Sequence, residues 1–196
     1  MPAASTGAFE PTFSKDQVMQ PRKLLDLGCG NKKRAGALGI DFNNRTAADL
    51  IHNLNVFPYP LESETFDEVY VDNCLEHLDD VIRVMEEIHR VLKPAGLVKV
   101  IVPYFRSTWA HIDPTHKHFF TVHSFAYFDP DDLICQRYDY SLARFKVEKT
   151  VFNETLANRW TKRLVLRLAN RWPSRYEYYF SHLYPLDDIS FYLRKL

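Results

Sequence analysis

The strongest constraint on the fold is an amphipathic helix that leads directly into a short apolar strand. Asp79 and Asp80 precede apolar residues that recur at helical spacing as far as residue 92, and carboxylates favour the exposed amides of a helix start. Residues 93–96 (Lys-Pro-Ala-Gly) are expected to end this helix. Residues 97–102 then form a nearly continuous apolar run, typical of a strand covered on both faces. Similar short strands are expected at residues 23–27, 37–41 and 66–72. The alternation predicts an α/β fold with a mostly parallel sheet.

Length and charge indicate one domain without a general affinity for polyanions. At 196 residues the chain is expected to form a single domain, residues 1–196, with a full core. Within it we expect a flexible arm at 1–20 and a helical insert at 155–185, before a last strand at 189–193. The 25 cationic and 25 anionic side chains cancel, so no global charge attracts nucleic acid or membranes. No apolar run reaches the roughly 20 residues that span a bilayer.

The cysteines and the N-terminal residues favour a reducing compartment. Cys29, Cys74 and Cys135 are widely spaced and odd in number, so they match neither a zinc motif nor a disulfide framework. The first residues contain neither the charged nor the apolar segment of a secretion signal. We therefore expect a cytoplasmic protein.

A strand that ends in a glycine turn, Leu25-Asp-Leu-Gly-Cys-Gly30, indicates a ligand site. Glycines let the backbone approach a ligand because no β-carbon intervenes. Asp41 ends the next predicted strand, where a carboxylate can accept hydrogen bonds from both hydroxyls of a ribose. The segments that follow are Phe-Asp-Glu-Val at 66–69, Asn-Cys-Leu-Glu-His-Leu at 73–78 and Arg-Val-Leu-Lys-Pro-Ala-Gly at 90–96. In this order, over residues 22–105, the chain resembles the class I S-adenosylmethionine-dependent methyltransferases, in particular the group with a Leu-Asp-Leu-Gly-Cys-Gly signature.

The resemblance implies a Rossmann-like sheet of seven strands, mostly parallel with the last strand antiparallel, and helices on both faces. It also implies S-adenosylmethionine as the cofactor, bound across the carboxyl ends of the strands. The positions that it implies for cofactor binding are Asp26, Gly28, Cys29 and Gly30 at the methionine part, Asp41 at the ribose, Asn53 and Leu54 at the adenine, and Asn73 and Cys74 beside the sulfonium.

Two features depart from the family pattern. Only about six residues separate Gly30 from the strand at 37–41, whereas a parallel crossover usually needs about a dozen or more, so the helix after the glycine turn is expected to be lost. The strand at 66–72 continues into Asn73 and Cys74. It lacks the Asp/Asn-Pro-Pro-Tyr motif of enzymes that methylate exocyclic amines of nucleic-acid bases, which argues against that activity.

A histidine-rich loop after residue 102 is the predicted substrate site. Methyl transfer to a hydroxyl or a protonated amine requires removal of a proton, a role that suits a histidine oriented by a carboxylate. We predict catalytic roles for His116, Asp113 and His111. The alternative is that Asp113 caps a turn and the histidines bond to its backbone. A metal held by these residues and His118 is chemically possible, but their spacing matches no standard motif and we predict none.

Residues 159–175 are predicted to form an amphipathic helix with six cations and no acid. Trp160, Leu164, Leu168 and Trp172 repeat every fourth residue beside a stripe of arginines. We expect the arginines to be solvated and the tryptophan face to be buried against the sheet or to close the pocket. The alternatives are a lid over an anionic substrate and a contact with anionic lipid, RNA or a protein partner.

The expected function is methyl transfer from S-adenosylmethionine to an oxygen or nitrogen of a small molecule. One alternative is a methyltransferase of RNA or protein, which would use the basic helix at 159–175 to hold its partner. The other is an S-adenosylmethionine-binding protein without transferase activity, in which the histidine loop is structural.

Overall fold

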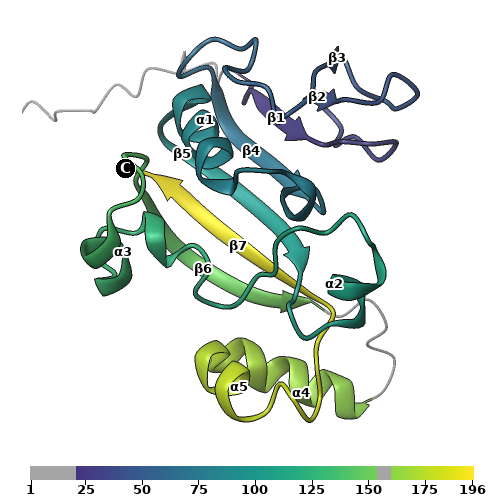
Figure 1. Cartoon of the computed structure of the whole chain (residues 1–196), viewed down its shortest axis with the longest axis vertical. Coiled ribbons are helices and arrows are strands. Elements are labelled where there is room, and N and C mark those ends of the chain that lie inside the picture. The colour runs from purple at the N-terminus through teal and green to yellow at the C-terminus, as the bar shows by residue number, and fades with distance from the viewer. Residues whose placement is uncertain (1–20, 154–159) are drawn as a thin grey trace, which may run out of the picture.

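The computed structural model describes residues 21–153 and 160–196, and its centre is a seven-stranded sheet (Figure 1). The strands are β1 (Leu24–Leu27), β2 (Ala37–Asp41), β3 (Leu50–Ile51), β4 (Phe66–Asp72), β5 (Leu92–Pro103), β6 (Phe145–Asn153) and β7 (Asp188–Lys195). Their order across the sheet is β3-β2-β1-β4-β5-β7-β6. The β7 strand runs antiparallel to both β5 and β6, and the other pairs are parallel. The predicted sheet is therefore confirmed.

The helices follow the sequence signals closely at α1. The elements are α1 (Val81–Val91), α2 (Thr108–Ile112), α3 (Leu133–Tyr138), α4 (Trp160–Arg171), α5 (Pro173–Tyr179) and two short 3₁₀ turns, η1 (Leu75–His77) and η2 (Ala126–Phe128). Asp80 caps α1, since its side chain accepts a hydrogen bond of 3.0 Å from the amide of Arg83. The segment at 93–96 ends the helix as expected, but it already belongs to β5.

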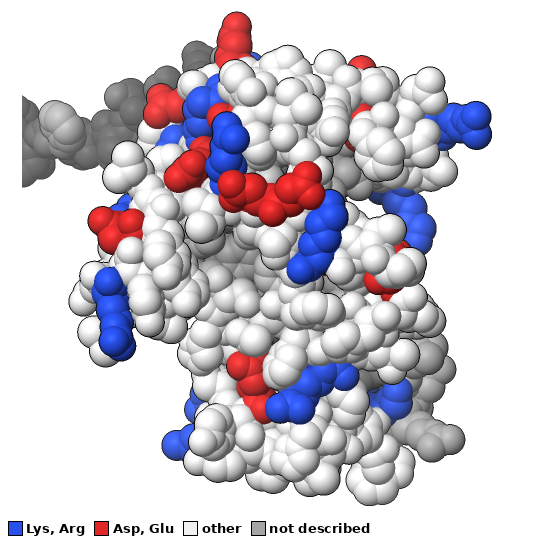
Figure 2. All heavy atoms as spheres, in the orientation of Figure 1, with Lys and Arg blue, Asp and Glu red and all other residues white. Residues whose placement is uncertain are grey.

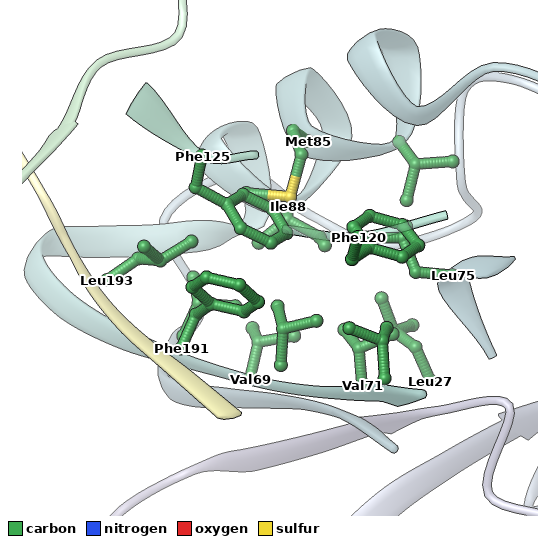
Figure 3. Close-up of a cluster of buried hydrophobic side chains, with 14 of the residues drawn as sticks. Leu27, Val69, Val71, Leu75, Met85, Ile88, Phe120, Phe125, Phe191 and Leu193 are labelled. Carbon is green, nitrogen blue, oxygen red and sulfur yellow. The ribbon is translucent and has the colours of Figure 1, made fainter. Parts of the chain in front are cut away.

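The hydrophobic core lies between α1 and one face of the sheet. Val69 and Val71 of β4 point towards Met85 and Ile88 of α1 (Figure 3), and all four are fully or almost fully buried. Burying one such side chain contributes about 1.5–3 kcal/mol. This layer therefore holds β4 and its carboxyl end in a fixed place.

The second face of the sheet is less deeply buried than the face that packs against α1. Buried and half-exposed residues alternate along β4 and β5, so the run at 97–102 is buried on one face and only half-buried on the other. On that second face Arg22 and Tyr70 both donate to Glu68, and the Arg34 guanidinium lies 3.7 Å from the centre of the Tyr70 ring. This face is less covered because the connections between the strands are short. In the described chain no helix lies between β1 and β2 or between β2 and β4.

The apolar stripe of α4 is exposed, so the prediction that it is buried was wrong. Its exposed fractions are 76% for Trp160, 48% for Leu164, 46% for Leu168 and 47% for Trp172. The helix packs instead through Ala169, which is fully buried, and through Asn170, whose amide bonds to both the N–H and the carbonyl of Phe152 at 2.6 and 3.0 Å. A stripe with a period of four drifts around a helix of 3.6 residues per turn, away from the face that contacts the sheet.

Two expectations cannot be compared with the structure. The arm at 1–20 and the start of the insert at 155–159, including Arg159, lie outside the described residues. Within the described residues, no helix combines the length and the apolar character that crossing a membrane requires.

Candidate functional site

Three cavities meet at the carboxyl ends of the parallel strands, the edge at which α/β sheets bind ligands. Their volumes are about 510, 780 and 380 Å³. Asn73, the residue after β4, lines all three, and its positive φ of 47° turns the chain sharply there. Gly28 lines the first and second cavities, and His77 lines the first and third. A ligand can therefore extend past Asn73 towards a second molecule in the third cavity.

Asp41 joins the glycine turn to the end of β2. It is 8% exposed, and its two carboxylate oxygens accept hydrogen bonds from the amides of Gly30 (2.9 Å) and Asn43 (2.8 Å). Each oxygen keeps a further lone pair. Asp41 lines the first cavity, so these lone pairs can accept hydrogen bonds from a ligand there.

Gly28 and Gly30 serve the turn differently. Both have positive φ, 67° and 50°. A β-carbon on Gly28 would lie only 2.7 Å from the Cβ of Cys74, whereas one on Gly30 would meet no atom within 4 Å. The absence of a side chain at Gly28 therefore lets the end of β1 pack against Cys74. The absence of one at Gly30 leaves open space for a ligand beside the backbone.

The second cavity contains side chains of both charges. Asp26 is 5% exposed, accepts a hydrogen bond of 2.7 Å from the amide of Arg34, and has its pKa raised by burial. The Nε of Arg34 is buried without a hydrogen-bond partner among the described residues. Carboxylates of Asp26 and Asp72 and the Arg34 guanidinium thus line one space, which suits a ligand with both an ammonium and a carboxylate group.

The two predicted cysteines line these cavities but are not nucleophiles. Cys29 lines the second cavity and Cys74 the first. Burial raises the pKa of both thiols, that of Cys74 to about 12, so both stay protonated near neutral pH.

Asn53 and Leu54 line the far end of the first cavity, together with a residue that the sequence analysis missed. The amide oxygen of Asn53 accepts a hydrogen bond of 3.0 Å from the amide of Asn55. The missed residue is Phe42, which is 76% exposed and offers an aromatic surface to the cavity. The sequence feature that could have identified Phe42 is its position as an aromatic residue directly after Asp41.

The three residues predicted to be catalytic occupy different surroundings. His116 and Asp113 line the third cavity. His111 does not: its Nε2 lies 2.9 Å from the carbonyl of Phe105, and its ring stacks on Phe119 with centroids 4.9 Å apart. The three predicted catalytic side chains therefore do not all line one cavity, and His111 is bonded to the backbone of Phe105 instead.

His116 lies beside Glu76, a residue to which the sequence analysis gave no role. Glu76 belongs to η1 and is 1% exposed, and neither of its carboxylate oxygens has a hydrogen-bond partner among the described residues. Its Oε1 lies 4.0 Å from Nε2 of His116. The histidine loop is held there because the amides of Lys117 and His118 donate to the Glu76 carbonyl. The only feature of the sequence that could have pointed to Glu76 is its position as an acidic residue shortly after Asn73.

Hydrogen bonds fix the protonation of one ring nitrogen in His116 and in His77. The carbonyl of Ala110 accepts from Nδ1 of His116 at 3.1 Å, so a neutral His116 presents an unprotonated Nε2. The Thr115 hydroxyl donates to Asp113 at 2.6 Å and can therefore accept from Nδ1 of His77 at 2.9 Å. The unprotonated Nε2 of His116 thus lies 4.0 Å from the buried carboxyl group of Glu76, and the ring of His77 lies beside that of His116 with centroids 4.7 Å apart.

The same environment shifts the protonation of its members. Burial, with the charges of nearby carboxylates, raises the pKa of Glu76 to about 7. Burial and the neighbouring His116 lower the pKa of His77. The hydroxyl and amide of Thr115 lower the pKa of Asp113, which therefore stays ionised and orients the Thr115–His77 pair.

This cluster also has the composition of a metal site. One ligand atom each from Glu76, His77 and His116 lie within 4.8 Å of one another. Zinc bonds of about 2.0–2.2 Å bring ligand atoms to roughly 3.4 Å from one another. His111 and His118 bond to backbone carbonyls elsewhere, so the four-residue set considered from the sequence does not assemble. Our prediction of no metal stands as a prediction.

Comparisons with known sequences agree with this geometry. The model of a methyltransferase domain family matches residues 25–100, which contain the glycine turn, Asp41 and Asn73. The demethylmenaquinone methyltransferase of Lysinibacillus sphaericus (strain C3-41) is 40% identical to a region that covers 43% of this chain and 46% of that protein. The chain therefore matches about half the length of this curated relative.

Solved structures show the same fold across most of the chain. An S-adenosylmethionine-dependent methyltransferase from Archaeoglobus fulgidus superposes with a TM-score of 0.54 at 15% identity and covers 90% of this chain and 87% of its own. One from Mesorhizobium loti gives a TM-score of 0.53 at 15% identity, with 88% and 90% covered. Residues 25–100 thus match a methyltransferase domain family, and the solved structures show that the chain has the fold of S-adenosylmethionine-dependent methyltransferases.

Proposed function

We propose that this protein transfers the methyl group of S-adenosylmethionine to an oxygen or nitrogen atom of a small molecule, with His116 as the proton acceptor. The observation that carries the proposal is the meeting of three cavities at Asn73, the third of which contains the Glu76–His116 pair. The third cavity has about 380 Å³, a volume that suits a small acceptor.

The residues of the first two cavities fit the cofactor. Asp26 and Arg34 would hold the ammonium and carboxylate groups of its methionine part, and the unpartnered Nε of Arg34 supports this assignment. Asp41 would accept from the ribose hydroxyls, and Asn53 with Leu54 would contact the adenine. When bound, the cofactor supplies an electrophilic methyl group on a sulfonium centre.

The residues of the third cavity would prepare the acceptor. Asn73 and His77 line both the first and the third cavity, so an acceptor bound in the third cavity would lie next to the cofactor site. The free Nε2 of His116 would take the proton of a hydroxyl or an ammonium, and Glu76 would stabilise the imidazolium that forms. The name of the relative, demethylmenaquinone methyltransferase, is consistent with a small-molecule acceptor.

The test is a search for a methylated product. The protein is incubated with S-adenosylmethionine carrying an isotopically labelled methyl group and with a small-molecule extract, and products are found by their shift in mass. We expect a labelled small molecule with the wild type, a rate about 10²–10⁴ lower with His116→Ala, and nearly full activity with His111→Ala as the matched control.

Calorimetry with S-adenosylhomocysteine separates loss of chemistry from loss of binding. We expect the same affinity for the wild type and for His116→Ala. Equal rates in the two histidine variants would contradict the role of His116. When a whole-cell extract replaces the small-molecule extract, a label found only in RNA or protein would support the macromolecular alternative.

A further inference from the structure

The α4–α5 end of the molecule has an exposed apolar surface that the proposed reaction does not use. We call it the α4–α5 surface and define it by Trp160, Leu164, Leu168, Trp172, Phe180 and Leu183. These six side chains are between 46% and 76% exposed. The elements that carry them lie beyond the end of the sheet, at the lower end of Figure 1. Contiguous exposed apolar surfaces of this kind mark contacts with a partner or a membrane.

A groove runs through this surface. It has about 450 Å³, and Leu168, Trp172, Phe180 and Leu183 contribute to its walls. Its floor is fixed, because Tyr176 is buried and its hydroxyl donates to the carbonyl of Tyr184 at 2.6 Å. A preformed apolar groove that is open to solvent is suited to a flexible hydrocarbon chain.

Cations accompany the apolar side chains. Arg167, Arg171 and Arg175 are exposed, and the guanidinium of Arg171 lies 5.6 Å from the centre of a Trp172 ring. Residues 159–175 contain no acidic residue, although the whole chain is neutral. In Figure 2 this end of the molecule is mostly uncharged, with several Lys and Arg side chains and fewer Asp or Glu side chains. The positive charge is therefore local and lies beside the apolar surface.

We infer that the α4–α5 surface binds the face of an anionic lipid bilayer. Tryptophan, tyrosine and phenylalanine insert at the level of the headgroups, arginines bind the lipid phosphates, and a short helix of this composition lies along the membrane plane. The α4 helix has only 12 residues, so it lies on the bilayer and does not cross it.

Charge favours a lipid surface over a second copy of this chain. In a two-fold dimer the same surface would occur on both partners, and the arginines would face like charges. An anionic bilayer instead offers phosphates to every arginine. Each basic residue near such a surface contributes about 1 kcal/mol, which is roughly fivefold in binding.

The experiment is sedimentation of the full chain with vesicles. The vesicles contain phosphatidylcholine alone or phosphatidylcholine with phosphatidylglycerol, and tryptophan fluorescence is recorded in a Trp109→Phe background so that Trp160 and Trp172 report. We expect binding to the anionic vesicles with a blue shift of the emission, weak binding to the neutral vesicles, and release at high salt.

Three variants separate the contributions of charge and apolar contact. Arg167→Glu with Arg171→Glu should lower binding at least about tenfold, and Leu164→Ser with Leu168→Ser should abolish the blue shift. Arg45→Glu with Arg137→Glu has the same change of net charge at exposed sites elsewhere and should bind like the wild type.

Several outcomes would overturn the inference. They are no binding to anionic vesicles by the wild type, equal loss of binding in the control variant, and salt-sensitive binding to RNA without binding to vesicles. A dimer in light scattering that Leu164→Ser with Leu168→Ser dissociates, again without vesicle binding, would assign the surface to a second copy. Methyl transfer to a water-soluble acceptor is measured without vesicles, so its outcome is independent of this test.

Discussion

At the scale of single residues, Glu76 is the least expected member of the site. It is buried with no hydrogen-bond partner among the described residues, and burial raises its pKa from 4.5 to about 7. Between these two values the folded protein keeps a proton that the unfolded chain has lost. The free energy of unfolding therefore falls as pH rises through this window, by up to about 3 kcal/mol.

Glu76→Gln removes this titration. We expect the variant to be more stable than the wild type at pH 8 by about 1–3 kcal/mol, and to show a flatter dependence of stability on pH. Urea unfolding from pH 5 to pH 8 measures both effects, and Glu62→Gln, which changes an exposed carboxylate, is the control. Stability curves of wild type and Glu76→Gln that run parallel across this range would contradict the assigned protonation.

At the scale of elements, Asn170 anchors α4 to the edge strand β6. Its side chain bonds to both backbone groups of Phe152, which covers an edge that could otherwise pair with another chain. Asn170→Ala leaves the buried N–H of Phe152 without its partner, and we expect a loss of about 1–3 kcal/mol in the free energy of unfolding.

Chemical denaturation checks this value. Arg167→Ala, a change on the exposed side of the same helix, should alter stability by less than about 0.5 kcal/mol. If both variants unfold at the same denaturant concentration, the Asn170 contacts do not hold the helix to the sheet.

At the scale of the whole molecule, one core joins elements from both ends of the chain. Buried residues of β1, β4, α1, β5, α5 and β7 form one hydrophobic cluster, which supports the proposal of a single domain. We expect one cooperative unfolding transition. Far-UV circular dichroism reports on the entire chain, whereas tryptophan fluorescence reports on residues 109–172, where all three tryptophans lie. Two transitions, or different midpoints for the two signals, would show separate units.

The sequence by itself determined the type of sheet and the places of the glycine turn and Asp41 at its edge. Strands of four to seven residues are specified by local apolar patterns, and the glycine turn and Asp41 sit at strand ends whose relative places follow from strand order. Those residues could be predicted because their positions depend on short-range pattern and on the rules of parallel sheets.

Only the tertiary structure decided the contact between Glu76 and His116 and the outward face of α4. Glu76 and His116 are 40 residues apart in sequence, and their contact depends on a loop docking onto η1, which no local pattern encodes. The amphipathic stripe of α4 was visible in the sequence, but its exposure was not. The contacts of Ala169 and Asn170 with the rest of the fold fix the rotation of that helix, and this rotation decides which of its faces meets solvent.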